Sequence, residues 1–258
     1  MSQNFVRFQH DGKAHFGMLN SSNEISFMEG DIFAEKRATG EKVDLSAVRL
    51  LAPVAAPRVF GIGNNYYQAV KQMNLAVPER PLVFTKPSTA VIASGESIIY
   101  PKGSDLVLFE GELAVVIGRR GRRIEKEDAS AYIFGYTCGN DLTERTLQLQ
   151  ELGAGSMCVS KGFDTFAPLG PAIVTEIDPA GVSIVSRVNG EVRQNGHTSD
   201  MIFDVATLIA YLSNAITLLP GDVIMTGTPA GFGPVVPGDR IEIELSGIGV
   251  LRNQVISE

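Results

Sequence analysis

Cysteine and histidine are scarce in this sequence, and their scarcity excludes several kinds of site. The two cysteines, Cys138 and Cys158, cannot build a disulfide framework in 258 residues, although a single bridge stays open. Low cysteine usage is typical of a reducing compartment, so we expect a cytoplasmic protein. The three histidines, His10, His15 and His197, are scattered without metal-ligand spacing, which excludes a histidine-based metal site.

Positive charge and long apolar runs are also lacking. The formal net charge is −7 and is spread along the chain, so we expect no extended surface for nucleic acid. No run is long and apolar enough for a transmembrane helix, and residues 1–17 carry charged side chains without the apolar core of a signal peptide. We therefore expect neither nucleic acid nor membrane as a partner. An anionic substrate would need a locally positive site.

The composition and the distribution of apolar runs indicate a globular protein with two parts. Hydrophobic residues make up 44% and charged residues 20% of the sequence. Residues 1–57 alternate short apolar runs with turn signals, which predicts a small N-terminal β domain. Pro53 and Pro57 mark the link to a second domain over residues 58–258, which is rich in strand-like runs. The sequence thus predicts an α+β fold built on a large β roll or sandwich.

Two segments of the second domain show helical character. Residues 200–218 place apolar side chains from Ile202 to Ile216 at helical spacing, after a possible cap at Ser199 and Asp200. We expect one helix there and a shorter one over residues 65–73.

Two carboxylates, Glu110 and Glu112, lie one residue apart in an apolar segment, residues 108–118, that has the pattern of a strand. Side chains two apart in a strand point to the same face. On a partly buried face these carboxylates would repel each other unless a cation lies between them, and a divalent metal ion is the usual answer. A solvated sheet face on which nothing needs neutralising is the alternative.

Asp141 follows a strand-like run and precedes residues that can start a helix, a common place for a ligand. Asp141 and Glu144 also form a capping-box pattern, which is the purely structural alternative. Together with Glu110 and Glu112, Asp141 would make an all-oxygen site of the kind that Mg²⁺ or Mn²⁺ takes.

Four more residues are candidates for substrate contacts. Arg145 and Gln148 fall three apart on the expected helix and can hold a carboxylate or carbonyl oxygen, although surface residues share this spacing. Lys161 lies between turn residues, where a solvated lysine is the more common outcome. Thr228 lies in a Gly-rich turn that can offer backbone N–H groups and its hydroxyl to an anion. This turn lacks the Gly-Lys-Ser/Thr end of a phosphate loop, so nucleotide binding is not expected.

Several short blocks occur in a fixed order along the second domain. They are PLVFTKP at 81–87, Glu-x-Glu at 110–112, GNDLT at 139–143, KGFD at 161–164, NGE at 189–191, TSDMIF at 198–203 and TGTPAG at 226–231. In these blocks the chain resembles the fumarylacetoacetate hydrolase superfamily, and in particular its smaller bacterial and mitochondrial-type members. The resemblance covers about residues 58–255. It implies a mixed β-sandwich roll, usually dimeric, with Mg²⁺ or Mn²⁺ held at Glu110, Glu112 and Asp141.

The resemblance also has implications for the substrate. It implies a small 2-oxo or enol carboxylate that chelates the metal. Arg145, Gln148, Lys161 and Thr228 match positions that line this substrate, and Tyr66 lies in the lid segment expected to contact its tail.

One segment departs from the family pattern. Members of this superfamily that hydrolyse acylpyruvates, and several that decarboxylate oxaloacetate, carry a His and a Glu three apart on a short lid helix, where they act as a water-activating dyad. When the chains are aligned on Asn65 and Tyr66, this chain has Ala69 and Gln72 at those positions. Neither side chain can act as a general base near neutral pH, so hydrolysis by the usual route is not expected.

The leading hypothesis is a metal-dependent isomerase or lyase that acts on 2-oxo dicarboxylates through a metal-stabilised enolate. Oxaloacetate tautomerase or decarboxylase and 2-hydroxyhepta-2,4-diene-1,7-dioate isomerase are the expected types. Lys161, with a pKa lowered by burial and the cation, is the expected catalytic group for proton transfer. Two alternatives stay open. One is an acylpyruvate- or fumarylacetoacetate-type C–C hydrolase in which His197 or another group replaces the dyad, and the other is a non-catalytic family member that binds a metabolite.

Overall fold

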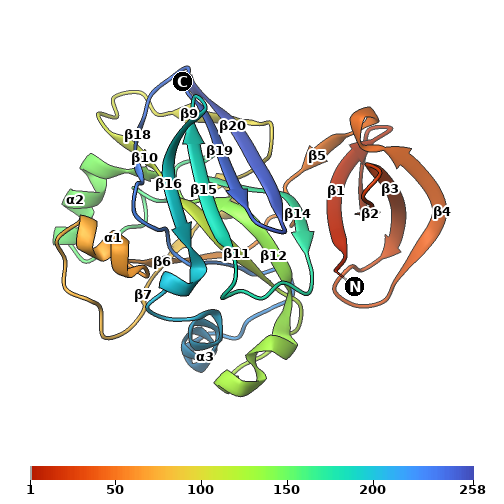
Figure 1. Cartoon of the computed structure of the whole chain (residues 1–258), viewed down its shortest axis with the longest axis horizontal. Helices are drawn as coiled ribbons and strands as arrows, with labels where there is room; N and C mark the ends of the chain where they lie inside the picture. Colours follow the sequence, from red (N-terminus) through yellow and green to blue (C-terminus); the bar gives the residue numbers. More distant parts are fainter. Residues whose placement is uncertain (1) are drawn as a thin grey trace.

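The computed structural model describes residues 2–258, and strands dominate it (Figure 1). A 12-stranded sheet runs through the molecule, accompanied by a five-stranded and a three-stranded sheet. Figure 1 shows the N-terminal strands as a lobe beside a larger body that carries the helices. The predicted α+β class is confirmed.

The N-terminal lobe is an antiparallel meander with a small core of its own. Its elements are β1 (Asn4–His10), β2 (Lys13–Leu19), β3 (Glu24–Gly30), β4 (Lys36–Asp44), the 3₁₀ turn η1 (Leu45–Ala47) and β5 (Arg49–Leu51). Phe8 and Phe27 meet edge to face in this core, with ring centroids 5.0 Å apart. Strand β1 also pairs with β14 (Ala167–Val174), so the sheet of the lobe continues into the larger body. The sheet thus continues across the predicted domain boundary at residue 57. The division into two domains stays a prediction.

The larger body supplies the remaining strands of the long sheet. From β14 onward the order is β12 (Ile133–Asn140), β11 (Gly111–Ile117), β17 (Val223–Met225), β6 (Val59–Gly63) and β7 (Leu82–Lys86), with β8 (Val91–Ala93) beside β14. Every residue of β11 is buried. Leu113 and Val115 pack into one core, while Ala114 and Val116 pack into a second core. Burial on both faces explains why this stretch is continuously apolar rather than alternating.

A second sheet packs on the Leu113 side of β11. Its order is β16 (Glu191–His197), β15 (Ser183–Val188), β19 (Arg240–Leu245), β20 (Gly249–Ser257) and β9 (Ser97–Tyr100). Ile184, Ile243 and Leu251 of this sheet share the core that contains Leu113, so the two sheets form a sandwich. The third sheet is small and consists of β13 (Thr143–Glu144), β10 (Val107–Phe109) and β18 (Gly233–Val235).

The chain changes sheets at Glu110. We expected residues 108–118 to form one strand, and this is wrong: β10 pairs with β13 and β18, whereas β11 pairs with β12 and β17. Glu110 lies between the two strands and belongs to neither. The residues before and after Glu110 are equally apolar, so the sequence gives no sign that the strand-pairing partners change at this residue. The two glutamates therefore converge through tertiary contacts and not through the period of one strand.

The α-helices of residues 2–258 are α1 (Tyr67–Gln72), α2 (Arg145–Gly153) and α3 (Val205–Ala215). The helix expected over residues 200–218 is shorter at both ends. At its start, Asp204 caps it instead of Ser199 and Asp200. The Asp204 carboxylate accepts a hydrogen bond from the Thr207 amide at 2.8 Å. The remaining 3₁₀ turns are η2 (Ser88–Ala90), η3 (Lys126–Tyr132) and η4 (Thr198–Asp200).

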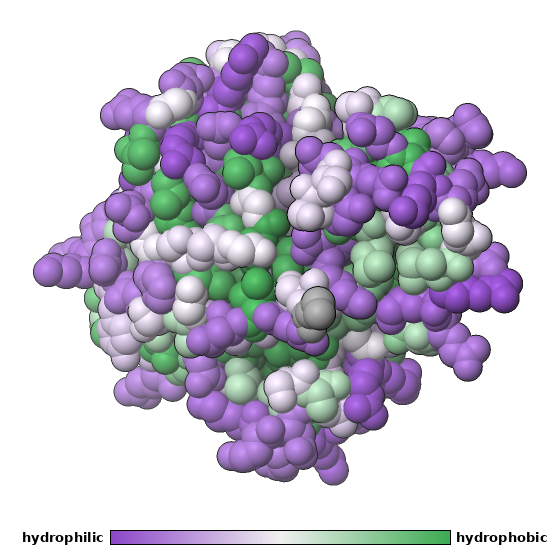
Figure 2. All heavy atoms as spheres, turned by 45° about the vertical axis from the view of Figure 1, so that its right-hand side comes forward, coloured by the Kyte–Doolittle hydropathy of each residue, from purple (hydrophilic) through white to green (hydrophobic). Residues whose placement is uncertain are grey.

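The face turned forward in Figure 2 is largely polar, with apolar patches gathered toward its middle. Within residues 2–258, none of the helices combines the length and the apolar character that crossing a membrane requires.

Replacing Asp204 with alanine tests the observed start of α3. The Thr207 amide would lose its partner, and we expect the free energy of unfolding to fall by about 1 kcal/mol in chemical denaturation. The exposed ion pair of Asp204 with Lys126 adds little to this. Ser199→Ala, at the exposed position first expected to cap the helix, should change stability by less than about 0.5 kcal/mol. Equal losses in the two variants would contradict the assigned cap.

Candidate functional site

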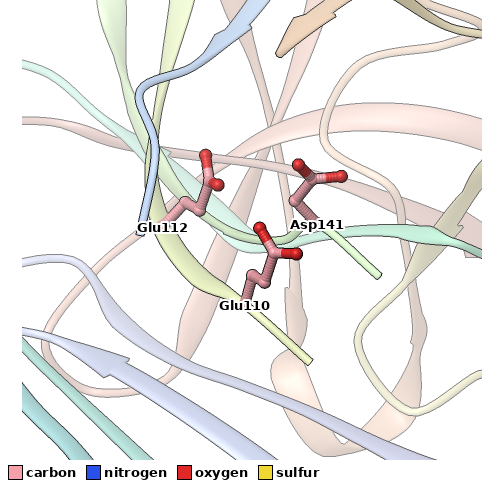
Figure 3. Close-up of side chains that lie close together, drawn as sticks. All are labelled: Glu110, Glu112 and Asp141. Carbon is pink, nitrogen blue, oxygen red and sulfur yellow. The ribbon is translucent and has the colours of Figure 1, made fainter. Parts of the chain in front are cut away.

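Three carboxylates converge where the sheets meet. Glu110 lies between β10 and β11, Glu112 is in β11, and Asp141 follows β12 directly. One oxygen of each lies within 4.8 Å of the others, and Figure 3 shows the three side chains pointing toward one another. Glu112 and Asp141 are each only 1% exposed. The structure thus brings the three predicted residues together, and a solvated sheet face is excluded for the two buried ones.

Hydrogen bonds between neighbouring segments hold Glu110 against Asp141. Asn140 Oδ1 accepts from the Glu110 backbone N–H at 3.0 Å, next to the point where Gly111 pairs with Asn140. The Asp141 backbone N–H donates to the Glu110 carbonyl oxygen at 2.9 Å. Thr143 Oγ1 donates to the Glu110 carboxylate at 2.5 Å. The backbone and the carboxylate of Glu110 are therefore both fixed.

Asp141 does not cap a helix, so the capping-box alternative is wrong. Helix α2 begins at Arg145, and its cap is Glu144, whose carboxylate accepts from the Leu147 amide at 2.5 Å. The Asp141 carboxylate instead contacts the charged groups of the site.

Two buried lysines neutralise part of the carboxylate cluster. Lys161 Nζ lies 2.7 Å from Asp141 Oδ2 and 3.0 Å from Glu110 Oε1. Lys86 Nζ lies 2.5 Å from Asp141 Oδ1 and 3.0 Å from the Leu142 carbonyl oxygen. Burial alone would raise the pKa of Asp141, but the two ammonium groups hold it below its usual range. The role of Lys86 was missed, because a lysine at the end of a short apolar strand carries no distinguishing signal.

The pKa of Lys161 is shifted in the direction opposite to our expectation. Burial lowers this pKa, but the carboxylates of Asp141 and Glu110 more than offset burial and raise it above the ordinary value of lysine. The lowered pKa belongs to Lys86, where burial outweighs the attraction of Asp141. Among the protein's own groups, Lys161 is thus a charged donor. The expected lowering of its pKa depends on a bound cation, and its role in proton transfer stays a prediction.

Glu112 is the carboxylate without a cationic partner. Within residues 2–258 it forms no ion pair, and its carboxylate accepts from the Gly227 backbone N–H at 2.8 Å. Burial, followed by the negative charges of Asp141 and Glu110, raises the pKa of Glu112. If all three carboxylates and both ammonium groups are charged, the cluster carries one unbalanced negative charge, and the raised pKa of Glu112 reflects this excess.

This donor set fits a hard divalent cation. Mg²⁺ and Mn²⁺ prefer oxygen ligands, and buried carboxylates are normally paired or bound to a metal. Glu110, Glu112 and Asp141 would hold the ion, and its charge would offset the unbalanced carboxylate. The donor atoms do not distinguish Mg²⁺ from Mn²⁺.

A cavity of about 240 Å³ adjoins the cluster. Glu110 and Lys161 lie in its wall, together with the predicted substrate residues Arg145, Gln148 and Thr228. Helices α1 and α2 both contribute to this wall. Most of the remaining surface is apolar and includes Ile62, Met73, Phe84, Leu108, Met157 and Phe232.

Arg145 is a second cation in the cavity wall. Its Nη1 donates to Gln148 Oε1 at 2.5 Å, as the spacing of three on one helix allows. No carboxylate of residues 2–258 forms an ion pair with Arg145. The guanidinium is therefore available to an anionic ligand.

Helix α1 offers no acid or base to the cavity. Ala69 lines the cavity, and Gln72 Oε1 accepts from the Gly231 backbone N–H at 2.7 Å. Tyr66 is 0% exposed and does not line the cavity, so the structure does not bring it to the substrate. Burial, followed by the charge of Glu112, raises the pKa of Tyr66.

His197 lies outside the cavity wall. It is exposed, and its Nδ1 lies 2.8 Å from Ser199 Oγ. The structure therefore gives no support to His197 as a replacement for the family's dyad.

Comparison with known proteins agrees with the fold. Residues 58–256 match the family model described as fumarylacetoacetate (FAA) hydrolase C-terminal, and residues 4–53 match the model described as Rv2993c-like, N-terminal. The mitochondrial oxaloacetate tautomerase of Homo sapiens is 41% identical over 222 residues, which are 82% of this chain and 70% of the relative.

Solved structures extend the likeness to nearly the whole chain. The 2-hydroxyhepta-2,4-diene-1,7-dioate isomerase from Mycobacterium marinum has a TM-score of 0.92 and 37% identity, with 99% of each chain covered. The fumarylpyruvate hydrolase from Pseudomonas aeruginosa, in complex with Mn²⁺ and pyruvate, has a TM-score of 0.75 and 34% identity, covering 80% of this chain and 91% of the other. These likenesses confirm the predicted β-sandwich roll, and the chain belongs to the fumarylacetoacetate hydrolase family.

Proposed function

We propose that this protein is a Mg²⁺- or Mn²⁺-dependent enzyme that acts on small 2-oxo dicarboxylates and their enol forms. Oxaloacetate tautomerase or decarboxylase and 2-hydroxyhepta-2,4-diene-1,7-dioate isomerase are the candidate activities. The observation that carries the proposal is a buried carboxylate cluster with a charged lysine, beside a cavity that also presents an unpaired arginine. The names of the human and mycobacterial relatives support the substrate class, because both denote enzymes of dicarboxylates.

The charges of the site suit a substrate with two negative groups. The carboxylates exceed the buried ammonium groups by one, so a divalent cation would leave the centre with a positive charge. When bound, Mg²⁺ or Mn²⁺ would supply Lewis-acid stabilisation of the negative charge that develops on the oxygen of a 2-oxo acid. Arg145 can take the other carboxylate of the substrate through two parallel hydrogen bonds. Gln148 orients that guanidinium through its own hydrogen bond.

We assign Lys161 to deliver a proton rather than to remove one. Its ammonium stays charged beside Asp141 and Glu110 and reaches the cavity wall. It can therefore protonate C3 of the substrate. For an enol, this completes conversion to the keto form once the enol hydroxyl has lost its proton to solvent, and for a 3-carboxyl substrate it follows the loss of CO₂. Solvent then returns a proton to the lysine.

Hydrolysis has less support than proton transfer. Activation of water needs a base beside the substrate, and α1 presents Ala69 and Gln72 where the family's dyad is expected. The likeness to a fumarylpyruvate hydrolase keeps C–C hydrolysis as the alternative to be tested.

We also expect a homodimer, on resemblance to the family alone, and a cytoplasmic location, on the low cysteine usage. The human relative is mitochondrial by name. Sedimentation equilibrium of the purified protein measures the oligomeric state.

Purified protein should accelerate oxaloacetate chemistry in a metal-dependent way. We expect the ultraviolet absorbance of the enol to decay faster with protein and Mg²⁺ than with Mg²⁺ alone, and EDTA should remove the difference. Decay without pyruvate identifies a tautomerase, and pyruvate release identifies a decarboxylase. Cleavage of acetylpyruvate, with no effect on oxaloacetate or on 2-hydroxyhepta-2,4-diene-1,7-dioate, would overturn the proposal in favour of a hydrolase.

Glu112→Gln should abolish metal binding and activity together. The substitution keeps the shape of the side chain but removes one oxygen anion, and we expect Mn²⁺ affinity to fall by more than about tenfold in titrations followed by electron paramagnetic resonance. Thermal stability without added metal should not fall, because an unbalanced buried charge disappears. Glu127→Gln, at an exposed site on η3, is the matched control and should change neither property. Full activity and unchanged Mn²⁺ affinity in Glu112→Gln would rule out this metal site.

Lys161→Met should lower kcat for the active substrate by roughly 10²- to 10⁴-fold, the usual contribution of a positioned proton donor. Lys71→Met, on the exposed side of α1, should leave kcat unchanged. A Lys161→Met enzyme that keeps most of its kcat would show that another group delivers the proton.

A further inference from the structure

Gln194 is a buried amide that links three segments far apart in the chain. It belongs to β16, the edge strand of the five-stranded sheet, and is 0% exposed. Its Oε1 accepts from the Gly111 backbone N–H at 3.0 Å and from Ser186 Oγ at 2.7 Å. Its Nε2 donates to Thr228 Oγ1 at 2.7 Å and to the Pro229 carbonyl oxygen at 2.8 Å. Both donors and both acceptor positions of the amide are therefore in use.

The contact with Gly111 ties Gln194 to the backbone of the metal ligands, since Gly111 lies between Glu110 and Glu112. Ser186 and Gln194 approach the backbone at position 111 so closely that only glycine fits there. A Cβ at Gly111 would lie 2.4 Å from Ser186 Oγ and 2.9 Å from Gln194 Oε1. The small residue between the two glutamates thus makes room for the amide.

Strand β16 also packs tightly on the turn after β17, residues 226–231, which we call the Thr228 loop. A Cβ at Gly196 would lie 2.4 Å from Pro229 Cβ. A Cβ at Gly231, where φ is +94°, would lie 2.1 Å from the Arg193 carbonyl oxygen. The Thr228 loop is therefore docked on a strand of the second sheet, on both sides of the Gln194 contact.

The hydroxyl of Thr228 is committed to this network. Its Oγ1 donates to the Gly111 carbonyl oxygen at 2.8 Å and accepts from Gln194 Nε2. A hydroxyl has one hydrogen, so Oγ1 cannot also donate to a substrate carboxylate while this bond exists. In this arrangement the hydroxyl does not donate to an anion, and the expected contact of Thr228 with substrate stays a prediction. The Gly227 and Gly231 N–H groups already donate to Glu112 and Gln72, so the backbone N–H group of Thr228, in the cavity wall, is the candidate for that task. Its direction depends on how the loop is held.

We propose that Gln194 is a positioning residue that sets the Thr228 loop in register with the metal ligands and thereby determines the affinity for a 2-oxo carboxylate. It acts through Gly111 and Thr228, because Gln194 does not itself line the cavity. The inference rests on the proposed function, since it concerns the same site.

Gln194→Glu tests the donor side of the amide separately from its acceptor side. The carboxylate keeps acceptors for Gly111 and Ser186 but replaces the donor to Thr228 and Pro229 with an oxygen. Pyruvate, the smallest 2-oxo carboxylate, serves as the probe in calorimetric titrations of the Mn²⁺-loaded protein. We expect pyruvate affinity to fall roughly tenfold or more, the effect of losing the buried hydrogen bonds to Thr228 and Pro229, while Mn²⁺ affinity changes by less than about threefold. KM should rise by a similar factor and kcat should change less.

Two more variants complete the experiment. Gln194→Met, which removes all four hydrogen bonds of the amide, should weaken both Mn²⁺ and pyruvate binding. Ser186→Ala, equally buried, removes a single bond to Gln194 and leaves the links to Gly111 and Thr228, so its pyruvate affinity should stay within about threefold of wild type. If Gln194→Met does not fold, the comparison of Gln194→Glu with Ser186→Ala decides.

The outcomes separate this inference from the proposed function. A wild-type protein that binds Mn²⁺ but not pyruvate would overturn the proposed function and this inference with it. A wild-type protein that binds both, with Gln194→Glu binding pyruvate as tightly as Ser186→Ala, would overturn the inference alone. A lowered melting temperature with unchanged pyruvate affinity would have the same meaning, because a merely structural role predicts it.

Discussion

Charge balance around Asp141 is the interaction on which the site depends. Burying three carboxylates is costly unless cations compensate them, and the fold brings Lys86, which precedes Asp141 in the chain, and Lys161, which follows it, to the same carboxylate. These lysines hold the pKa of Asp141 below its usual range, whereas burial and the other carboxylates raise the pKa of Glu112, which forms no direct ion pair within residues 2–258. The same three-residue cluster therefore contains one satisfied carboxylate and one that favours a metal ion.

The sheets supply the rigidity that such a cluster needs. Strand β11 is buried on both faces, and it carries Glu112 in the middle of the sandwich. Glu110 lies where the chain passes from the small sheet to the long one, held by Asn140 and Thr143. Gln194 adds a link from the second sheet to Gly111. Ligands placed on packed strands keep their geometry better than ligands on free loops, which suits a metal site.

The chemistry that we propose follows from what lies around the cavity and from what α1 lacks. Ala69 and Gln72 offer neither acid nor base, and Gln72 instead binds the backbone of Gly231. Among residues 2–258, Lys161 is the lysine that contacts the carboxylate cluster and also lines the cavity. Proton delivery to carbon needs only such a donor and a place for negative charge, whereas hydrolysis also needs an activated water.

Residue type and spacing alone determined that Glu110, Glu112 and Asp141 are candidate metal ligands, because acidic pairs in apolar segments need a cation wherever they are buried. They also determined that the fold is rich in strands, since alternation and turn residues are local properties. Tertiary structure alone decided that Glu110 lies between two sheets and that the pKa of Lys161 rises while that of Lys86 falls. These properties depend on burial and on distances of a few ångströms between segments remote in the chain, which no local pattern of residues encodes.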